Sequence, residues 1–201
     1  AVFRCAILIK QNYVVQLEQN LADVSEQNAD ALKEQIQIRF NLLKSVAMRF
    51  NIEPENRKET LYMFEPVADA FHLKRIGFCD EKGMTYATSG NITDLSHRDF
   101  FIRSMKGDFC ISLVDSDAMD DSGEPLTIMT MPIYDKENQI NGIAGITYTT
   151  ESLSQELAIK FFNGMGNTFI LNEAGTVVIS SDENIAATNK NMFDLLWKES
   201  A

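Results

Sequence analysis

The chain has 201 residues, with 18 Lys and Arg against 29 Asp and Glu, so its formal net charge is −11. A chain of this length forms one or two domains and buries roughly 70% of the surface that it exposes when unfolded. Its composition, 45% hydrophobic and 23% charged, is that of a globular protein rather than a disordered one. The acidic balance argues against nucleic acid or an anionic lipid surface as the main partner, because both attract basic patches. No apolar run reaches the ~20 residues of a membrane-spanning helix.

A long helix is predicted over 11–50, because this segment contains no proline or glycine. One apolar stripe runs from Val14 to Leu42, and a second, neighbouring stripe runs from Leu32 to Phe50. Forty helical residues extend for roughly 60 Å, so the second stripe can cover a globular body while the first binds a partner helix. We therefore expect a homodimer through this helix. The alternative is a monomer in which both stripes form one wide surface facing the core.

A shorter helical segment and a series of strands follow Pro54, which ends the long helix. The short helical segment is expected over 56–71, and strands are expected at 75–80, 84–89, 109–114, 126–134 and 140–149. Gly83 is expected at the turn of the first hairpin. A helix over 98–106 is predicted to begin with a capping box formed by Ser96 and Asp99, and another helix is predicted from Thr150.

The segment 167–181 repeats the segment 75–89 at an offset of 92, with a glycine of the turn at Gly83 and again at Gly175. Further along, Asn191 is expected to be the counterpart of Arg98, and Phe193 that of Phe100. The repeat predicts a duplicated module in an α+β fold. We expect three parts. These are the long helix with its connecting helix (1–71), a complete antiparallel-sheet module (72–150), and a linking helix with a second, apparently truncated module (151–201).

Five segments, taken in this order, resemble the motifs of the double Cache (dCache) sensor family: DEKG at 80–83, DLSHRDFF at 94–101, IS at 111–112, PIYD at 132–135 and GIAG at 142–145. The resemblance covers residues 11 to about 195. It implies a long helix carrying two PAS-like modules on the extracytoplasmic side of the cell membrane, with flanking transmembrane helices outside this chain. It also implies a small-molecule ligand in the membrane-distal module, 72–150. The implied output is a histidine kinase, a diguanylate cyclase or a chemoreceptor.

Arg98 is the first candidate for ligand binding, because an arginine beside the N–H groups of a helix can clamp a carboxylate. The alternative is a surface ion pair with Asp94 or Asp99, which contributes only ~0–1 kcal/mol. The resemblance adds Phe100 and Phe101, which stand where the amino-acid-binding branch of the family has Trp and Tyr. At least one of these two phenylalanines is expected to belong to the core.

Thr147 stands, by the resemblance, where that branch has the aspartate that holds the ligand's ammonium group. A buried ammonium without a carboxylate lacks its charge partner. We therefore expect a small carboxylate, such as an organic or keto acid, rather than an ordinary amino acid. Asp115 or Asp117, in the loop after the strand at 109–114, is the candidate acidic contact. The acidic segment 115–124 lacks the spacing of an EF-hand, so a solvated loop is favoured over a calcium site.

Catalytic chemistry has little support in the sequence. His72 and His97 are the only histidines, and neither a nucleophile elbow nor a phosphate loop is present. Cys79 and Cys110 are expected to be small buried residues without a disulfide between them. We therefore expect a binding domain with no cofactor, no metal and no enzymatic activity of its own. The alternatives are a ligand-free structural module and a cytoplasmic PAS-type domain that binds a cofactor.

Overall fold

The computed structural model describes residues 2–52, 56–114, 123–157, 169–171, 174–180 and 191–193. The chain divides into two compact units, 1–38 and 39–201, and the boundary falls inside a single helix, α1 (Val2–Ile52). The long helix predicted over 11–50 is therefore confirmed, and it extends beyond both predicted ends. Within the described segments, no helix is both long and apolar enough to cross a membrane.

The helical segment predicted over 56–71 is two short helices, α2 (Arg57–Tyr62) and α3 (Glu65–Ala70). The second begins with Pro66 in its first turn, after Phe64 as the N-cap residue. A proline is tolerated there because the first N–H groups of a helix have no partner inside it, whereas further along it would remove a hydrogen bond. The proline therefore starts a new helix rather than continuing the old one.

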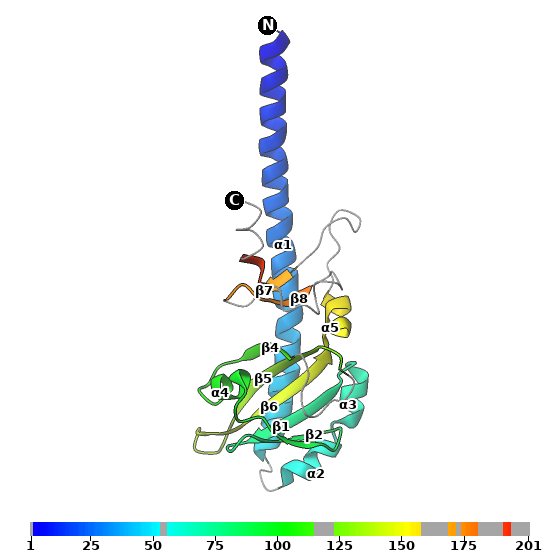
Figure 1. Ribbon diagram of the computed structural model, residues 1–201, viewed down its shortest axis with the longest axis vertical. Helices are drawn as coiled ribbons and strands as arrows, with labels where there is room; N and C mark the ends of the chain where they lie inside the picture. Colours follow the sequence, from blue (N-terminus) through cyan, green and yellow to red (C-terminus); the bar gives the residue numbers. More distant parts are fainter. Residues whose placement is uncertain are drawn as a thin grey trace. The chain divides into compact units, whose positions relative to one another are not determined.

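Six strands form one antiparallel sheet in the order β3-β2-β1-β6-β5-β4 (Figure 1). They are β1 (Arg75–Asp80), β2 (Met84–Ala87), β3 (Ile92–Asp94), β4 (Cys110–Val114), β5 (Leu126–Tyr134) and β6 (Ile140–Thr149). The helix α4 (Asp99–Ser104) connects β3 to β4. Because β1 and β4 are not neighbours, Cys79 and Cys110 cannot pair across adjacent strands. Both are buried free thiols, as predicted.

The two faces of the sheet are covered by different helices. Phe78 of β1 meets Phe50 of α1, with ring centroids 5.0 Å apart. Its neighbour Cys79 belongs instead to a buried cluster with Phe100 and Phe101 of α4. Since successive side chains of a strand point to opposite faces, residues 39–52 of α1 cover one face and α4 lies over the other.

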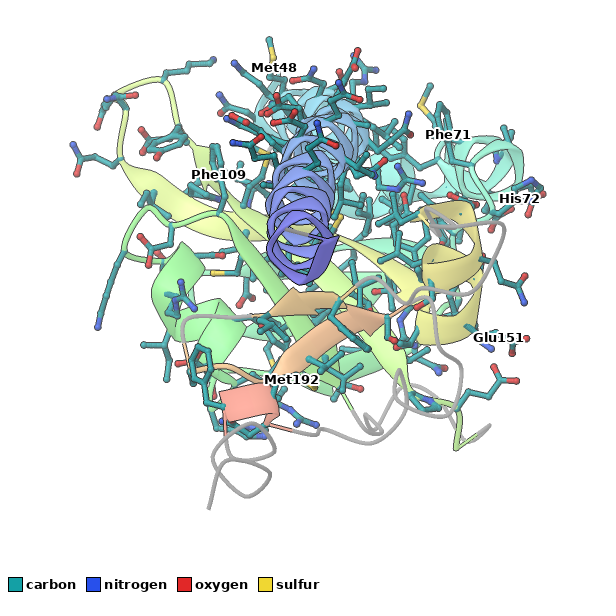
Figure 2. The ribbon with its side chains drawn as sticks, turned by 90° about the horizontal axis from the view of Figure 1, so that it is seen from above. Met48, Phe71, His72, Phe109, Glu151 and Met192 are labelled. Carbon is teal, nitrogen blue, oxygen red and sulfur yellow. The ribbon has the colours of Figure 1, made fainter. Side chains whose placement is uncertain are left out.

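The second apolar stripe of the long helix is buried along this part of α1. Leu43 and Phe50 are fully buried, and Ala47 is 5% exposed. Further back along the same segment, the ring of Phe40 stacks on that of Phe109 at 5.6 Å, and Figure 2 shows Phe109 beside α1. Met48 is 60% exposed and points away from the sheet (Figure 2). The part of the second stripe from Leu43 to Phe50 therefore packs on the sheet, as expected.

A second hairpin follows α5 (Thr150–Leu157), which begins at the predicted residue directly after β6. The hairpin pairs β7 (Phe169–Leu171) with β8 (Val177–Ser180). Its turn glycine, Gly175, has φ 81°, close to the 86° of Gly83 in the first hairpin. Both angles lie in the left-handed region that glycine adopts without a steric penalty. The repeated hairpin is therefore present in the structure.

The return from the hairpin differs from the prediction. Asp94 pairs with the residue directly after Gly83, and Asn191 pairs with the residue directly after Gly175. Each of the two side chains accepts a 2.9 Å hydrogen bond from the backbone N–H two residues further on. Asn191 is therefore the counterpart of Asp94, and its predicted match with Arg98 is wrong. Asp94 comes eleven positions after Gly83, whereas Asn191 comes sixteen positions after Gly175. A nearly constant offset between the two copies therefore paired the wrong residues.

The same correspondence reassigns Phe193. A Cβ atom on Gly83 would lie 2.5 Å from Ser96, and a Cβ atom on Gly175 would collide with the ring of Phe193. Phe193 therefore takes the place of Ser96, and its predicted match with Phe100 is wrong. In both copies the chain returns so closely over the turn glycine that a side chain there has no room.

Candidate ligand-binding site

Arg98 is the N-cap residue of α4, with an extended backbone (φ −77°, ψ 138°), and its side chain is partly buried. The predicted capping box does not form, because α4 starts two residues later than that motif requires and has no side-chain cap. Ser96 instead donates its backbone N–H to the Asp94 carboxylate at 2.9 Å. This hydrogen bond is the largest cause of a lowered pKa of Asp94, and a hydrogen bond from the Ser96 side chain is the second largest. With only six residues, α4 is also too short for a strong helix dipole.

A cavity of about 30 Å³ lies on the α4 side of the sheet. Strands β1, β2, β5 and β6 contribute most of its wall, and Leu95 and Phe100 approach it from the α4 side. The lining residues are Arg75, Gly77, Phe78, Cys79, Thr85, Ala87, Leu95, Phe100, Ile128, Thr130, Ile143, Gly145 and Thr147. A cavity of this size holds about two water molecules.

Two threonines in the wall are engaged by neighbouring side chains. The hydroxyl of Thr85 lies 2.7 Å from the Sγ atom of Cys79, and that of Thr130 lies 2.9 Å from the hydroxyl of Ser104. Burial raises the pKa of Cys79 to about 12, so this thiol is neutral near pH 7. This part of the wall therefore carries no charge.

Thr147 and Arg75 give the wall its remaining polar character. Thr147 is 5% exposed, and its hydroxyl makes no hydrogen bond to another residue of the described segments. Arg75 is 4% exposed and is the one charged residue among those that line the cavity in the described part of the chain. The cavity is therefore largely apolar, with one cationic group and one available hydroxyl.

The residues predicted from the sequence occupy different places. Phe100 and Thr147 line the cavity. Phe101 is 7% exposed and lies in the same buried cluster as Phe100, but it does not line the cavity. Arg98 is not among the lining residues either. Asp115, Asp117 and most of the acidic loop 115–124 lie outside the described residues.

Sequence reasoning missed Arg75. The available signal was a charged residue at the head of an otherwise apolar strand, Arg75-Ile-Gly-Phe-Cys. Its meaning depends on which strand lies opposite, and local periodicity does not report that. In the parts of the chain that the structure describes, no group of three or more His, Cys, Asp or Glu side chains is placed to hold a metal ion.

Comparison with known proteins gives the family. The sequence model of the Cache domain (dCache_1) matches residues 8–198. No curated protein matched the chain by sequence.

Several solved structures share the fold. The ligand-binding domain of the Pseudomonas aeruginosa PAO1 amino acid chemoreceptor PctC, in complex with GABA, has a TM-score of 0.69 at 16% identity, over 90% of this chain and 82% of that one. The ligand-binding domain of the Pseudomonas fluorescens chemoreceptor CtaA, in complex with L-serine, has a TM-score of 0.70 at 16% identity, over 90% and 78%. The sensor domain of the V. cholerae histidine kinase DctB has a TM-score of 0.54 at 14% identity, over 84% and 71%. With its long helix, its six-stranded sheet and a family match along almost its whole length, the chain belongs to the Cache domain family, the dCache sensor domains.

Proposed function

We propose that this chain is the extracytoplasmic small-molecule sensor of a transmembrane signalling receptor, and that its ligand binds in the module 72–150. The observation that supports this most is the cavity between the sheet and α4, which has a cationic and a hydroxyl group in an otherwise apolar wall. Such a mixture of apolar surface and a few polar groups is typical of small-molecule sites. The output domain is proposed to be a histidine kinase, a diguanylate cyclase or a chemoreceptor.

A small carboxylate is the proposed ligand class. The similar chemoreceptor domains were solved with GABA and L-serine, which carry an ammonium as well as a carboxylate. In this chain, the described cavity wall contains no Asp or Glu, and the residue predicted at the ammonium position is Thr147. An ammonium group buried there would have no carboxylate partner in that wall. Arg98, the cation predicted from the sequence, and Asp115 or Asp117 remain candidate contacts.

Signal transmission is proposed to run through helix rearrangement. The sheet that forms the cavity on one face supports residues 39–52 of α1 on the other. A ligand bound against the sheet favours one of two arrangements of the long helices only if its affinity differs between the two arrangements. The receptor is proposed to be a homodimer through the stripe from Val14 to Leu42, in which Val24 and Ile38 are 38% and 48% exposed.

A thermal-shift screen of this chain with carboxylates, amines, amino acids and sugars tests the proposal. A specific ligand at 100 times its Kd adds about 2.7 kcal/mol, which raises the Tm of a chain of this size by about 5–10 °C. We expect such a shift for at least one small carboxylate. If no compound of the panel shifts the Tm, the chain is instead a ligand-free structural module, a function that the small volume of the cavity favours.

A further inference from the structure

Arg75 is a buried charged residue in the central part of the sheet. It opens β1, is 4% exposed and lines the cavity. Burying a guanidinium is costly unless its charge and its N–H groups are satisfied. Arg75 has an interaction of its own within the protein. It therefore combines a structural contact with a position in the cavity wall.

Thr147 lies directly opposite Arg75, on the neighbouring strand β6, and Ile128 of β5 lies opposite Thr147 on its other side. All three residues line the cavity. The Thr147 hydroxyl, 5% exposed and without a hydrogen bond to another described residue, can donate to an oxygen in the cavity. A guanidinium and a hydroxyl on adjacent strands supply the donors that the oxygens of a carboxylate accept.

The remainder of the described wall limits the ligand in charge and in size. It contains no Asp or Glu, so an ammonium group would meet the like charge of Arg75 and no opposite charge in that described wall. The cavity of about 30 Å³, with Leu95 and Phe100 in its wall, leaves space for a few atoms only. A short acid without an amino group satisfies both limits.

We propose that Arg75, together with Thr147, anchors the carboxylate of a monocarboxylic acid of two or three carbons. This inference rests on the proposed function, because it assumes that the cavity is the ligand site. It assigns the anchor to the head of β1 rather than to the N-terminus of α4.

Isothermal titration calorimetry of the chain with sodium acetate, sodium propionate, acetamide and L-alanine tests the ligand class. Acetamide has the shape of acetate without its charge, and L-alanine adds an ammonium to propionate. We expect acetate or propionate to bind at least tenfold more tightly than acetamide and L-alanine. Tighter binding of acetamide or L-alanine would overturn the inference.

Variants test the anchor. Arg75→Lys keeps the positive charge but loses the two parallel N–H donors of the guanidinium, and it is expected to weaken the binding of the tighter-binding acid, acetate or propionate, at least tenfold. Thr147→Val keeps the shape of the side chain and is expected to weaken the same binding at least fivefold. Arg103→Gln, an exposed arginine on α4, serves as the control and is expected to leave the affinity within twofold. If Arg75→Lys fails to fold, the affinity of Thr147→Val for the acid alone tests the anchor. Arg98→Gln is expected to weaken binding less than either change at the anchor.

Two results separate this inference from the proposed function. If the acid binds to Arg75→Lys and Thr147→Val as tightly as to the unmodified chain, the assignment of Arg75 and Thr147 as the anchor is wrong while the sensor function stands. The same holds if Arg98→Gln weakens the binding of the acid more than these two variants do. If no compound of the wider thermal-shift panel binds, the sensor function fails, and the inference fails with it.

Discussion

Thr147 and Tyr148 are consecutive residues of β6 whose side chains lie on opposite faces of the sheet. Thr147 lines the cavity. Tyr148 is 1% exposed, and the guanidinium of Arg39 from α1 lies 5.8 Å from the centroid of its ring. Arg39 also pairs with Glu156 of α5 at 2.5 Å. Through Tyr148 and Arg39, the strand β6 therefore connects the cavity wall to α1, and the ion pair of Arg39 extends this connection to α5.

The burial of Tyr148 predicts a loss of stability in alkali. Burial raises the pKa of its hydroxyl from 10 to about 12, an effect that the nearby charge of Arg39 only partly opposes. A group whose pKa is raised by folding stabilises the protein fully below its unfolded pKa and loses that contribution as the pH rises toward the folded value. Between pH 9 and pH 11, the free energy of unfolding should therefore fall by about 1 kcal/mol more in the unmodified chain than in Tyr148→Phe.

Urea unfolding at pH 9, 10 and 11 measures this difference. Tyr148→Phe keeps the ring and removes only the titrating hydroxyl, so other groups that titrate in this range affect both proteins alike. Parallel pH curves for the two proteins would show that Tyr148 is not buried as described.

Arg57 is predicted to be a major contributor to stability. Its Nε atom donates to the carbonyl of Phe50 at 3.1 Å, and its Nη2 atom donates to Oδ1 of Asn141 at 2.7 Å. It thus joins α1, α2 and β6 in a site where its own side chain is only 8% exposed, and burial lowers its pKa. Arg57→Ala leaves both acceptors without this donor and should reduce the free energy of unfolding by about 2–4 kcal/mol.

The adjacent Lys58 offers a matched control. Its ammonium lies 4.3 Å from the centroid of the Tyr86 ring, and Lys58 itself is exposed. Lys58→Ala should therefore cost only about 0.5–1 kcal/mol. Equal losses in urea unfolding for the two variants would contradict the assigned role of Arg57.

Two glycines that face each other in the sheet should respond differently to alanine. Gly77 and Gly145 are paired on β1 and β6. A Cβ atom on Gly77 would lie 2.8 Å from the backbone oxygen of Tyr86, whereas one on Gly145 would lie 3.5 Å from its nearest neighbour, a methyl group of Thr130. Gly77→Ala should therefore destabilise the chain by about 1–3 kcal/mol, while Gly145→Ala should be neutral or slightly stabilising.

Gly145→Ala also has a consequence for binding. Its new methyl group would lie at the cavity wall, beside Thr130 and Ile128. Any compound that shifts the Tm of the unmodified chain should shift that of Gly145→Ala less. An unchanged Tm shift would place the ligand elsewhere in the molecule.

The proposed dimer predicts that a charge at Ile38 prevents association. Ile38 lies on the stripe from Val14 to Leu42 and is 48% exposed, so Ile38→Glu should leave folding intact while placing a carboxylate in the interface. Lys33→Glu introduces a carboxylate on another side of the same helix and should leave the dimer in place. Sedimentation velocity distinguishes these cases, and a monomer at every concentration of the unmodified chain would contradict the dimer.

The secondary structure was largely readable from local patterns. The strands β1, β5 and β6 begin and end at the predicted residues, because short runs rich in apolar and β-branched residues, bounded by turn residues, mark such strands in the sequence itself. The long helix was equally readable, because a run of forty residues without proline or glycine leaves few alternatives. The break at Pro66 was missed because a proline in the first turn starts a helix as readily as a proline elsewhere ends one.

The cavity could not be derived in the same way. Phe100 and Phe101 are adjacent in sequence and share one buried cluster, but only Phe100 also lines the cavity. The orientation of α4 on the sheet decides this difference. The counterpart of Arg98 was misassigned because the two copies differ in loop length, which a comparison at a nearly constant offset does not detect.

The amino-acid sequence by itself determined the helices and strands, the repeated hairpin and, through five short motifs, the family. The tertiary structure decided which side chains share the cavity. Arg75 and Thr147 are far apart along the chain and meet because β1 pairs with β6 in one particular register. Strand order and register depend on contacts between distant segments, whereas the sequence pattern records only the preference of each segment for its own conformation.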